Sequence, residues 1–266
     1  MVFVQRKNLE GVCSVTIDWR KTVAAIWRPR KGYLRAIESV DQIKLDQLIG
    51  IDDQKAQLIR NTERFITGAG ANNALLWGSR GTGKSSLIKA VLNAFSEEGL
   101  RLIQVDRNDL VELPEIVDDI RALPQRFIVF CDDLTFESGE ASYRALKSVL
   151  EGSIEEPPAN VLIYSTSNRR HLLPETMSEN REARLVGDDL HLGDTTEEKL
   201  ALSDRFGLWL SFYPVNWQGY LEIVDSYFAD YDGDRKALHE AAKLFAMTRG
   251  GTKNGRAAKQ FFNTCF

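Results

Sequence analysis

Residues 78–85 read Gly-Ser-Arg-Gly-Thr-Gly-Lys-Ser, and they stand between an apolar run, ALLW at 74–77, and a stretch of helical periodicity that begins at Lys84. In such a strand–loop–helix unit, glycines let backbone N–H groups turn toward phosphate oxygens, and the start of the helix adds the positive end of its dipole. The spacing therefore predicts a phosphate-binding loop. The alternative is a glycine-rich turn that binds nothing.

Two side chains of this loop have the chemistry that a nucleoside triphosphate needs. The Lys84 ammonium can reach the β and γ phosphates, and the Ser85 hydroxyl can complete the coordination of Mg²⁺. We therefore expect ATP and Mg²⁺ as ligands. The residues expected to contact ATP in this segment are Gly78, Ser79, Arg80, Gly81, Thr82, Gly83, Lys84, Ser85 and Ser86.

Around this loop, short apolar runs alternate with helical stretches, which predicts an α/β fold: a parallel five-stranded sheet with flanking helices, followed by a small C-terminal helical lid. We expect a nucleotide-binding domain at 41–215, a lid at 216–266 and a separate basic segment at 1–40. The predicted strands are 74–77, 102–105, 127–131, 161–164 and 208–215. The predicted helices are 84–95, 113–123, 143–150, 218–231, 235–247 and 255–262.

The N-terminal segment carries a charge opposite to that of the remaining chain. Residues 1–35 hold eight Lys/Arg against two Asp/Glu, a net charge of +6, which leaves −10 for the rest of a chain whose total is −4. The apolar runs at 12–19 and 22–27 predict a β-hairpin. Its aromatic residues Trp19, Trp27 and Tyr33 alternate with cations, a mixture that can stack bases and neutralise phosphates of nucleic acid. Core packing of the aromatic residues is the alternative.

The run FIVFCDD ends in two carboxylates that follow a buried strand. Asp132 is expected to meet Mg²⁺ through water, and Asp133 to orient or deprotonate the attacking water. Because this strand is third in sequence, the order differs from that of kinases and GTPases, in which the metal-binding strand usually neighbours the loop strand. The alternative is a pair of acidic residues in an ordinary loop.

Three further residues are candidates for contact with the nucleotide. Asn168 follows the next strand and can hold the attacking water, or can serve as a turn former. Arg205 precedes the last strand, where it can act on the γ-phosphate of a neighbouring copy as an arginine finger, or can form a local salt bridge to Asp204 or Glu198. Arg256 begins the last helix and can touch the nucleotide from the lid, or can be a solvated surface residue.

The ordered set of phosphate loop, CDD, TSN, SDRFG and NGR resembles the AAA+ ATPases over about residues 45–266. In that resemblance Asn168 matches sensor 1, Arg205 the finger and Arg256 sensor 2. The usual second acidic residue is Glu, whereas Asp133 stands here, so the base is either Asp133 or the nearby Glu137. The segment DRNDLVELPE lacks the aromatic pore loop of protein unfoldases, which disfavours polypeptide threading.

A narrower resemblance is carried by LIGIDDQK, FCDDLTFESGEASYRALKSVLEG, VLIYSTSNRRHLLPE and LSDRFGLWLSF, which are similar to a bacterial AAA+ family, domain of unknown function 815. In this family Arg169 or Arg170 is a competing candidate for the finger. The segment LIGI, with Ile49, looks like the part of AAA+ proteins that packs on adenine, and a turn between helices is the alternative.

These features together favour a Mg-dependent ATPase that assembles with itself to remodel or load a partner. The alternatives are a nucleic-acid-associated initiator or loader that uses the basic segment, and a nucleotide-gated scaffold that hardly hydrolyses ATP. The start of the chain lacks the apolar core of a signal peptide, and three scattered cysteines support no disulfide framework. We therefore expect a cytoplasmic protein without a membrane span.

Overall fold

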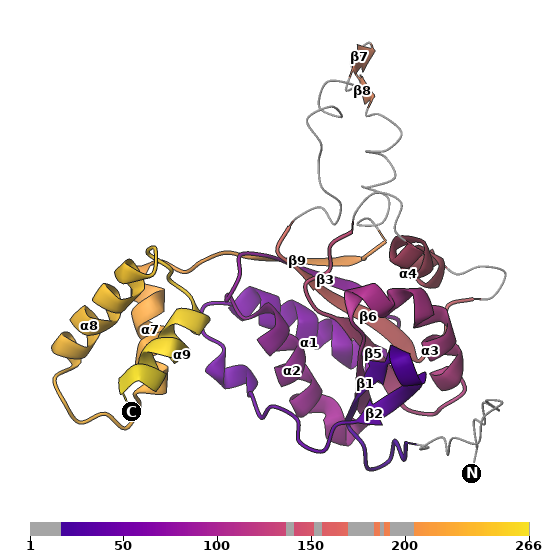
Figure 1. The fold of residues 1–266 in the computed structure, drawn as a ribbon, viewed down its shortest axis with the longest axis horizontal. Coiled ribbons are helices and arrows are strands. Elements are labelled where there is room, and N and C mark those ends of the chain that lie inside the picture. Colours follow the sequence, from indigo (N-terminus) through magenta and orange to yellow (C-terminus); the bar gives the residue numbers. More distant parts are fainter. Residues whose placement is uncertain are drawn as a thin grey trace.

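A computed structural model describes residues 17–136, 141–151, 156–169, 184–186, 189–191 and 205–265. Seven strands form one sheet in the order β2-β1-β4-β5-β6-β3-β9, and β7 and β8 form a separate antiparallel pair (Figure 1). The strands are β1 Ala24–Arg28, β2 Tyr33–Ala36, β3 Ala74–Gly78, β4 Leu100–Gln104, β5 Arg126–Cys131, β6 Val161–Ser167, β7 Arg184–Val186, β8 Asp189–His191 and β9 Leu208–Phe212.

The five predicted strands are all present as β3, β4, β5, β6 and β9, and their pairings are parallel. β6 lies between β5 and β3, with Cys131 opposite Ser165 on one side and Leu76 opposite Thr166 on the other. Since parallel strands end at the same edge, the segments that follow β3, β5 and β6 emerge side by side. The predicted phosphate loop, acidic pair and Asn168 are those segments.

The N-terminal hairpin was predicted with the wrong partner strand. β1 pairs antiparallel with β2, which follows it in sequence, and parallel with β4 on its other side. Both edges of β1 are thus occupied, and Asp18 to Lys21 form a turn before it. Residues 12–16 of the predicted hairpin lie outside the described part of the chain. The sheet therefore has seven strands, two more than expected.

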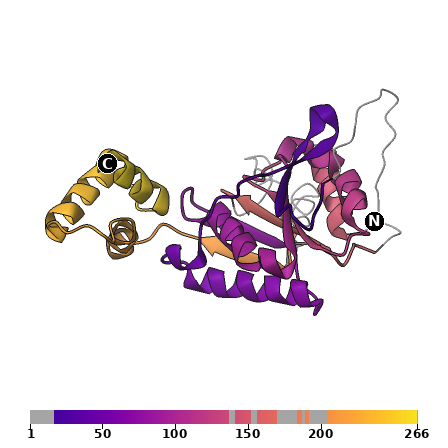
Figure 2. The same cartoon turned by 90° about the horizontal axis from the view of Figure 1, so that it is seen from below.

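Helices cover both faces of the sheet (Figures 1 and 2). α1 and α2 pack on one face through Leu58, Phe65 and Leu92, while α3 and α4 pack on the other through Ile116 and Leu146. The helices are α1 Asp52–Thr67, α2 Lys84–Phe95, α3 Leu113–Ile120, α4 Ala141–Glu151, α7 Trp217–Tyr227, α8 Arg235–Thr248 and α9 Gly255–Cys265, and the 3₁₀ helices are η1 Pro29–Lys31, η2 Leu45–Gln47, η3 Ser96–Glu98 and η4 Arg107–Glu112.

Helix α1 is an element that the sequence analysis did not anticipate. Asp52 and Asp53 stand in its first turn, where carboxylates are favourable beside the helix dipole. Leu58 and Phe65 recur at helical spacing and are buried, and Gly68 ends the helix in the left-handed conformation. The signals for this helix were therefore present in the sequence.

The C-terminal helices α7, α8 and α9 form a unit with its own apolar core, beside the sheet domain (Figure 2). Tyr220, Ala242 and Phe261 are among its buried residues. Asn216 caps α7 by accepting a hydrogen bond from Gly219 N, and Asp234 caps α8 by accepting one from Lys236 N. In the parts of the chain that the structure describes, no helix has the length and apolar character needed to cross a membrane.

A buried polar network joins α1 to the centre of the sheet. The Tyr164 hydroxyl accepts a hydrogen bond from Asn61 Nδ2 at 3.0 Å and shares one with Thr62 Oγ1 at 2.9 Å. Asn61 Nδ2 also donates to Asn72 O, and Thr62 Oγ1 to Leu58 O. Burial raises the pKa of Tyr164 to about 12.

We predict that Tyr164→Phe lowers the free energy of unfolding at neutral pH by about 1 kcal/mol, because the hydroxyl is lost while Asn61 and Thr62 each keep a backbone acceptor. Above about pH 10 the wild type should lose stability as the pH rises, since the unfolded tyrosine deprotonates first and the folded one only near 12. Urea unfolding at both pH values measures this. Tyr213→Phe, at an exposed position, is the control, and equal curves for both variants would contradict the prediction.

Candidate functional site

The loop after β3 has a backbone conformation that depends on its glycines. Gly78 has φ +133°, and a Cβ there would lie 2.0 Å from Phe212 O of the neighbouring strand β9. Gly81 and Gly83 also adopt positive φ values, +78° and +98°. Within the loop, Thr82 Oγ1 donates to Ser79 O at 2.8 Å. The loop thus has the glycine-dependent turn that the motif predicts.

Lys84 points back across the loop from the first residue of α2. Its Nζ donates to Gly78 O and Ser79 O, both at 2.8 Å, and to Asn168 Oδ1 at 3.2 Å. The residue is only 7% exposed. Burial lowers the pKa of Lys84, while the charges of Asp132 and Asp133 oppose this shift. The ammonium is therefore held at the loop by backbone carbonyls and by a side chain from β6.

Asp132 joins the phosphate loop to two neighbouring strands. Its Oδ1 accepts a hydrogen bond from Ser85 Oγ at 2.6 Å and another from Thr166 Oγ1. A serine hydroxyl beside a carboxylate is a set of hard oxygen donors, the kind that Mg²⁺ prefers. Ser85 and Asp132 therefore fit the predicted cation, although each now bonds to the other.

Asp133 stands in an unusual backbone conformation beside the lysine. Its φ is +54°, the only positive value for a non-glycine residue in the described part of the chain. Thr166 stabilises this turn, because its Oγ1 accepts a hydrogen bond from Asp133 N at 3.0 Å. The carboxylate accepts a hydrogen bond from Asn168 Nδ2 at 2.5 Å. Asn168 therefore bridges Lys84 and Asp133.

A model of the family described as "Protein of unknown function (DUF815)" matches residues 20–266. The chain belongs to this family. Curated proteins gave no match to the chain. A chain of the E. coli MS115-1 HORMA:CdnC:Trip13 complex is similar in structure, with 12% identity, a TM-score of 0.53, and coverage of 83% of this chain and 90% of that one.

Two structures of the Thermotoga maritima RuvB Holliday junction branch migration motor are also similar, at lower TM-scores. The first has 13% identity, a TM-score of 0.46 and coverage of 84% of this chain and 72% of that one. An R170A variant has 14% identity, a TM-score of 0.48 and coverage of 83% and 71%. The likeness to the chain of the Trip13 complex and the sheet order together show that the DUF815 chain has an α/β fold of the AAA+ type, with a mostly parallel sheet, flanking helices and C-terminal helices.

Two residues of the site were missed in the sequence analysis of this DUF815 protein. Thr166 bonds to the Asp132 carboxylate and to the backbone N–H of Asp133, and its only signal was a polar residue near the end of an apolar strand. Asn254, from the loop before α9, donates from Nδ2 to Arg80 O at 2.9 Å. Its neighbour Arg256 is exposed, and the charges of Arg256 and Arg80 both act to lower the pKa of Lys84. The lid therefore reaches the phosphate loop directly.

The segment expected at adenine lies between the sheet domain and the lid. Ile51 is buried in the core of the sheet domain, and its Cδ1 is 3.6 Å from where a Cβ of Gly83 would stand. Ile49 packs instead on the C-terminal helices. Lys55 Nζ holds the segment in place by donating to Leu48 O at 2.8 Å. Ile51 thus packs on the sheet domain and Ile49 on the C-terminal helices.

Arg205 is not brought together with the other candidate residues. It lies just before β9 and pairs with Glu151 at the end of α4, whereas the predicted salt-bridge partners Asp204 and Glu198 lie outside the described residues. Because β9 and β3 are parallel, the start of β9 and the loop after β3 lie at opposite edges of the sheet. Arg169 is exposed next to Asn168, whereas Glu137 and Arg170 lie outside the described residues.

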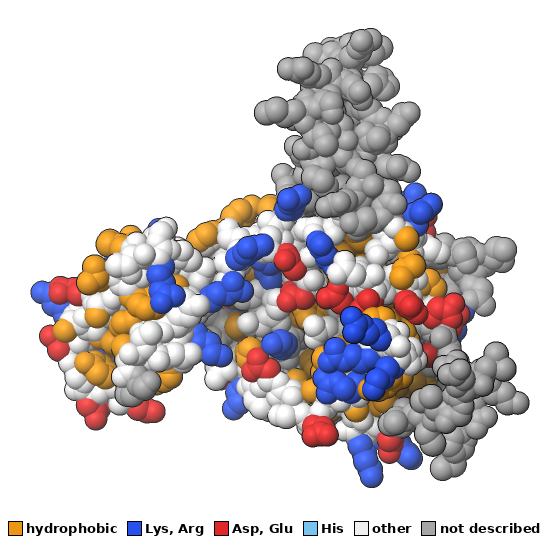
Figure 3. All heavy atoms as spheres, in the orientation of Figure 1, with side chains coloured by type: hydrophobic (Ala, Val, Ile, Leu, Met, Phe, Trp, Pro, Cys, Tyr) orange, Lys and Arg blue, Asp and Glu red, His pale blue; other side chains and the backbone are white. Residues whose placement is uncertain are grey.

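The basic N-terminal segment forms a charged surface, but its two tryptophans are buried and are not part of that surface. Lys and Arg side chains gather over the β1–β2 edge of the molecule (Figure 3). Trp19 and Trp27 are 8% and 3% exposed and belong to the core, so neither can stack on a base. The nucleic-acid interpretation therefore rests mainly on charge and stays a prediction. The exposed cations, which form no salt bridge within the described ranges, are Arg28, Arg30, Lys31 and Arg35.

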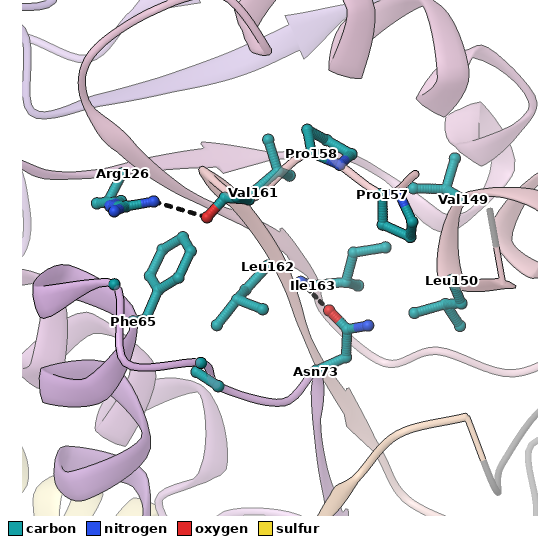
Figure 4. Close-up of a pocket in the computed structure, with 14 residues that line it drawn as sticks. Phe65, Asn73, Arg126, Val149, Leu150, Pro157, Pro158, Val161, Leu162 and Ile163 are labelled. Carbon is teal, nitrogen blue, oxygen red and sulfur yellow. Dashed lines mark hydrogen bonds between the residues drawn. The ribbon is translucent and has the colours of Figure 1, made fainter. Parts of the chain in front are cut away.

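A cavity of about 340 Å³ lies where β3, β5 and β6 begin, at the edge of the sheet away from the phosphate loop (Figure 4). Arg126 lines it, with Nη1 donating to Ala159 O at 2.7 Å and the guanidinium 5.6 Å from the Phe65 ring centre. Asn73 Oδ1 accepts a hydrogen bond from Ile163 N. Both polar groups thus bond to the protein itself, and no phosphate chemistry is indicated there.

The lowered pKa of Lys84 leads to a pH prediction for binding. Phosphate anions beside the ammonium would raise this pKa again, so binding of Mg·ATP should take up a proton when part of the lysine is neutral. The affinity for Mg·ATP should therefore fall as the pH rises through the pKa that Lys84 has in the unliganded protein. Below that pKa, the titration of Lys84 should not affect the affinity.

Titrations with Mg·ATP between about pH 7 and about pH 10 measure this dependence. Lys84→Arg is the matched control, because arginine stays charged throughout this range. The affinity of Lys84→Arg for Mg·ATP should be weaker than that of wild type and should change less with pH. A wild-type curve parallel to that of the arginine variant would contradict the prediction.

Proposed function

We propose that this DUF815 protein is a Mg-dependent ATPase that hydrolyses ATP to ADP and phosphate. The observation that supports this most strongly is the network of Lys84, Ser85, Asp132, Asp133 and Asn168, in which side chains from α2 and from the ends of β5 and β6 meet at the phosphate loop. An ammonium, a hydroxyl, two carboxylates and an amide at one glycine-rich loop are the groups that phosphoryl transfer requires.

Each residue has a part that follows from its contacts. Residues 78–86 bind the triphosphate through the loop backbone, and Lys84 exchanges one of its present acceptors for phosphate oxygens. Ser85 and Asp132 hold Mg²⁺, which supplies charge neutralisation of the phosphates when it is bound. Ile49 lies against adenine, and Arg256 contacts the nucleotide from the lid.

Asp133 and Asn168 act on the attacking water. Asn168 orients the water through its amide, and Asp133 accepts a proton from it as the water oxygen bonds to the γ-phosphorus and the bond to the ADP oxygen breaks. The hydrogen bond from Asn168 to Asp133 keeps the two groups together before substrate arrives. Glu137 is the alternative base.

We further propose that copies of the chain assemble, with Arg205 of one copy acting at the phosphate loop of the next. This is supported by the location of Arg205 at the sheet edge away from its own loop. The pair with Glu151 would have to open for that role. Nucleotide-driven changes in the assembly would then remodel or load a partner protein in the cytoplasm.

The first test separates binding from hydrolysis. Lys84→Ala should lose affinity for Mg·ATP by about 100-fold or more, because a charge-assisted contact to phosphate is removed. Asp133→Asn keeps the acceptor for Asn168, so its affinity should stay within about threefold of wild type while turnover falls by about 100-fold or more. Calorimetry and phosphate release measure the two quantities.

Glu137→Gln is the matched control for the base. Turnover that persists in Asp133→Asn and disappears in Glu137→Gln would transfer the base to Glu137. Binding without turnover in wild type would favour the scaffold alternative, and undiminished binding by Lys84→Ala would refute the site.

The second test concerns the finger. Arg205→Ala should lose turnover by about 10³-fold or more with little change in affinity, because the arginine acts on the charge of the transition state. Mixing this variant with Lys84→Ala should restore activity, since each supplies what the other lacks. Arg169→Ala is the control, and loss of turnover in that variant alone would assign the finger to Arg169.

A further inference from the structure

Asn254 is a buried residue whose side-chain amide both donates and accepts a hydrogen bond. It lies directly before α9 and is only 7% exposed. Its Oδ1 accepts a hydrogen bond from Ala257 N at 2.9 Å, which caps the helix. Its Nδ2 donates to Arg80 O at 2.9 Å, 174 residues away in sequence. One amide thus joins the start of the last lid helix to the phosphate loop.

The loop is shaped to receive this side chain. A Cβ on Gly81 would lie 2.7 Å from Asn254 Nδ2, so any larger residue would displace the asparagine. Gly255 also faces the loop, at an ordinary van der Waals distance: a Cβ there would lie 3.7 Å from Gly81 O. The close approach of Asn254 to the loop therefore requires a glycine at position 81.

The bond to Arg80 O also fixes the direction of a peptide group. In a trans peptide, the carbonyl of one residue and the N–H of the next point in opposite directions. Because Asn254 holds the Arg80 carbonyl on the lid side, the Gly81 N–H points away from the lid. Inward-turned N–H groups are what such a loop offers to phosphate oxygens.

We propose that Asn254 is a positioning residue of the nucleotide site, which fixes the peptide between Arg80 and Gly81 and carries α9, with Arg256, toward the bound phosphates. This inference rests on the proposed function. Its consequence is that the loop conformation that holds phosphate and the position of the lid change together. Asn254 would thereby link nucleotide binding to lid movement without itself touching the reacting atoms.

The other helix caps of the lid show that capping does not need this contact. Asn216 caps α7 by accepting a hydrogen bond from Gly219 N at 2.9 Å, and it is exposed. Asp234 caps α8 in the same way. Asn216 thus offers a matched control, because Asn→Asp keeps the cap acceptor at either position and removes the amide donor at both.

The test compares Asn254→Asp, Asn254→Ser and Asn216→Asp. Both Asn254 variants can still cap α9, but a carboxylate cannot donate to Arg80 O and a serine hydroxyl is too short to reach it. We expect affinity for Mg·ATP to fall by about 10-fold in both, the loss typical of one hydrogen bond. Asn216→Asp should bind as wild type does, and melting temperatures without nucleotide should stay close to wild type in all three.

Hydrogen exchange reports on the lid. Mg·ATP should protect amides of α9 in wild type and Asn216→Asp, and should protect them much less in the Asn254 variants at equal saturation. Equal affinity and equal protection in all variants would overturn the inference and leave the proposed function intact. A matching loss of melting temperature without nucleotide in both Asn254 variants would assign Asn254 to lid stability and also overturn it. Absence of Mg·ATP binding in wild type would overturn the proposed function, and this inference with it.

Discussion

The insertion of β6 between β5 and β3 is the constraint on which the candidate site depends. Parallel pairing on both sides of β6 makes three strands end at one edge, so Ser85, Asp132 and Asn168 approach one another although they are far apart in sequence. The alternation of side chains along a strand makes this sensitive to register, since a shift by one residue would turn Thr166 to the opposite face. Thr166 then could not bond to both Asp132 and Asp133.

The site combines a buried cation with a strained carboxylate. Burial disfavours the charged form of Lys84, and hydrogen bonds to two backbone carbonyls and to Asn168 offset that cost. Asp133 holds a left-handed conformation that costs a non-glycine residue about 1 kcal/mol, and Thr166 stabilises it from the neighbouring strand. Because these polar groups already bond to one another, a ligand exchanges partners instead of entering an unsatisfied site. The network thus holds its residues in place before binding.

The two edges of the sheet separate two kinds of contact. The carboxyl edge bears the phosphate loop, and the lid meets it there through Asn254. The amino edge bears Arg205, paired with Glu151, and a cavity in which Arg126 and Asn73 bond to the protein itself. Within one chain, the lid thus contacts the phosphate loop directly, whereas Arg205 lies at the edge of the sheet away from that loop.

Local patterns in the amino-acid sequence were sufficient to predict the glycine-rich loop, the five core strands and the helices α2, α3 and α4, because hydrophobic periodicity and glycine placement are properties of neighbouring residues. They also indicated Asp132, Asp133 and Asn168, since polar residues after buried strands mark an edge. Three features could be recognised only in the folded structure: the partner of β1, the pairing of Arg205 with Glu151, and the contact of Asn254 with Arg80. No local sequence pattern marks any of these contacts, because each partner is selected by how the segments pack in three dimensions.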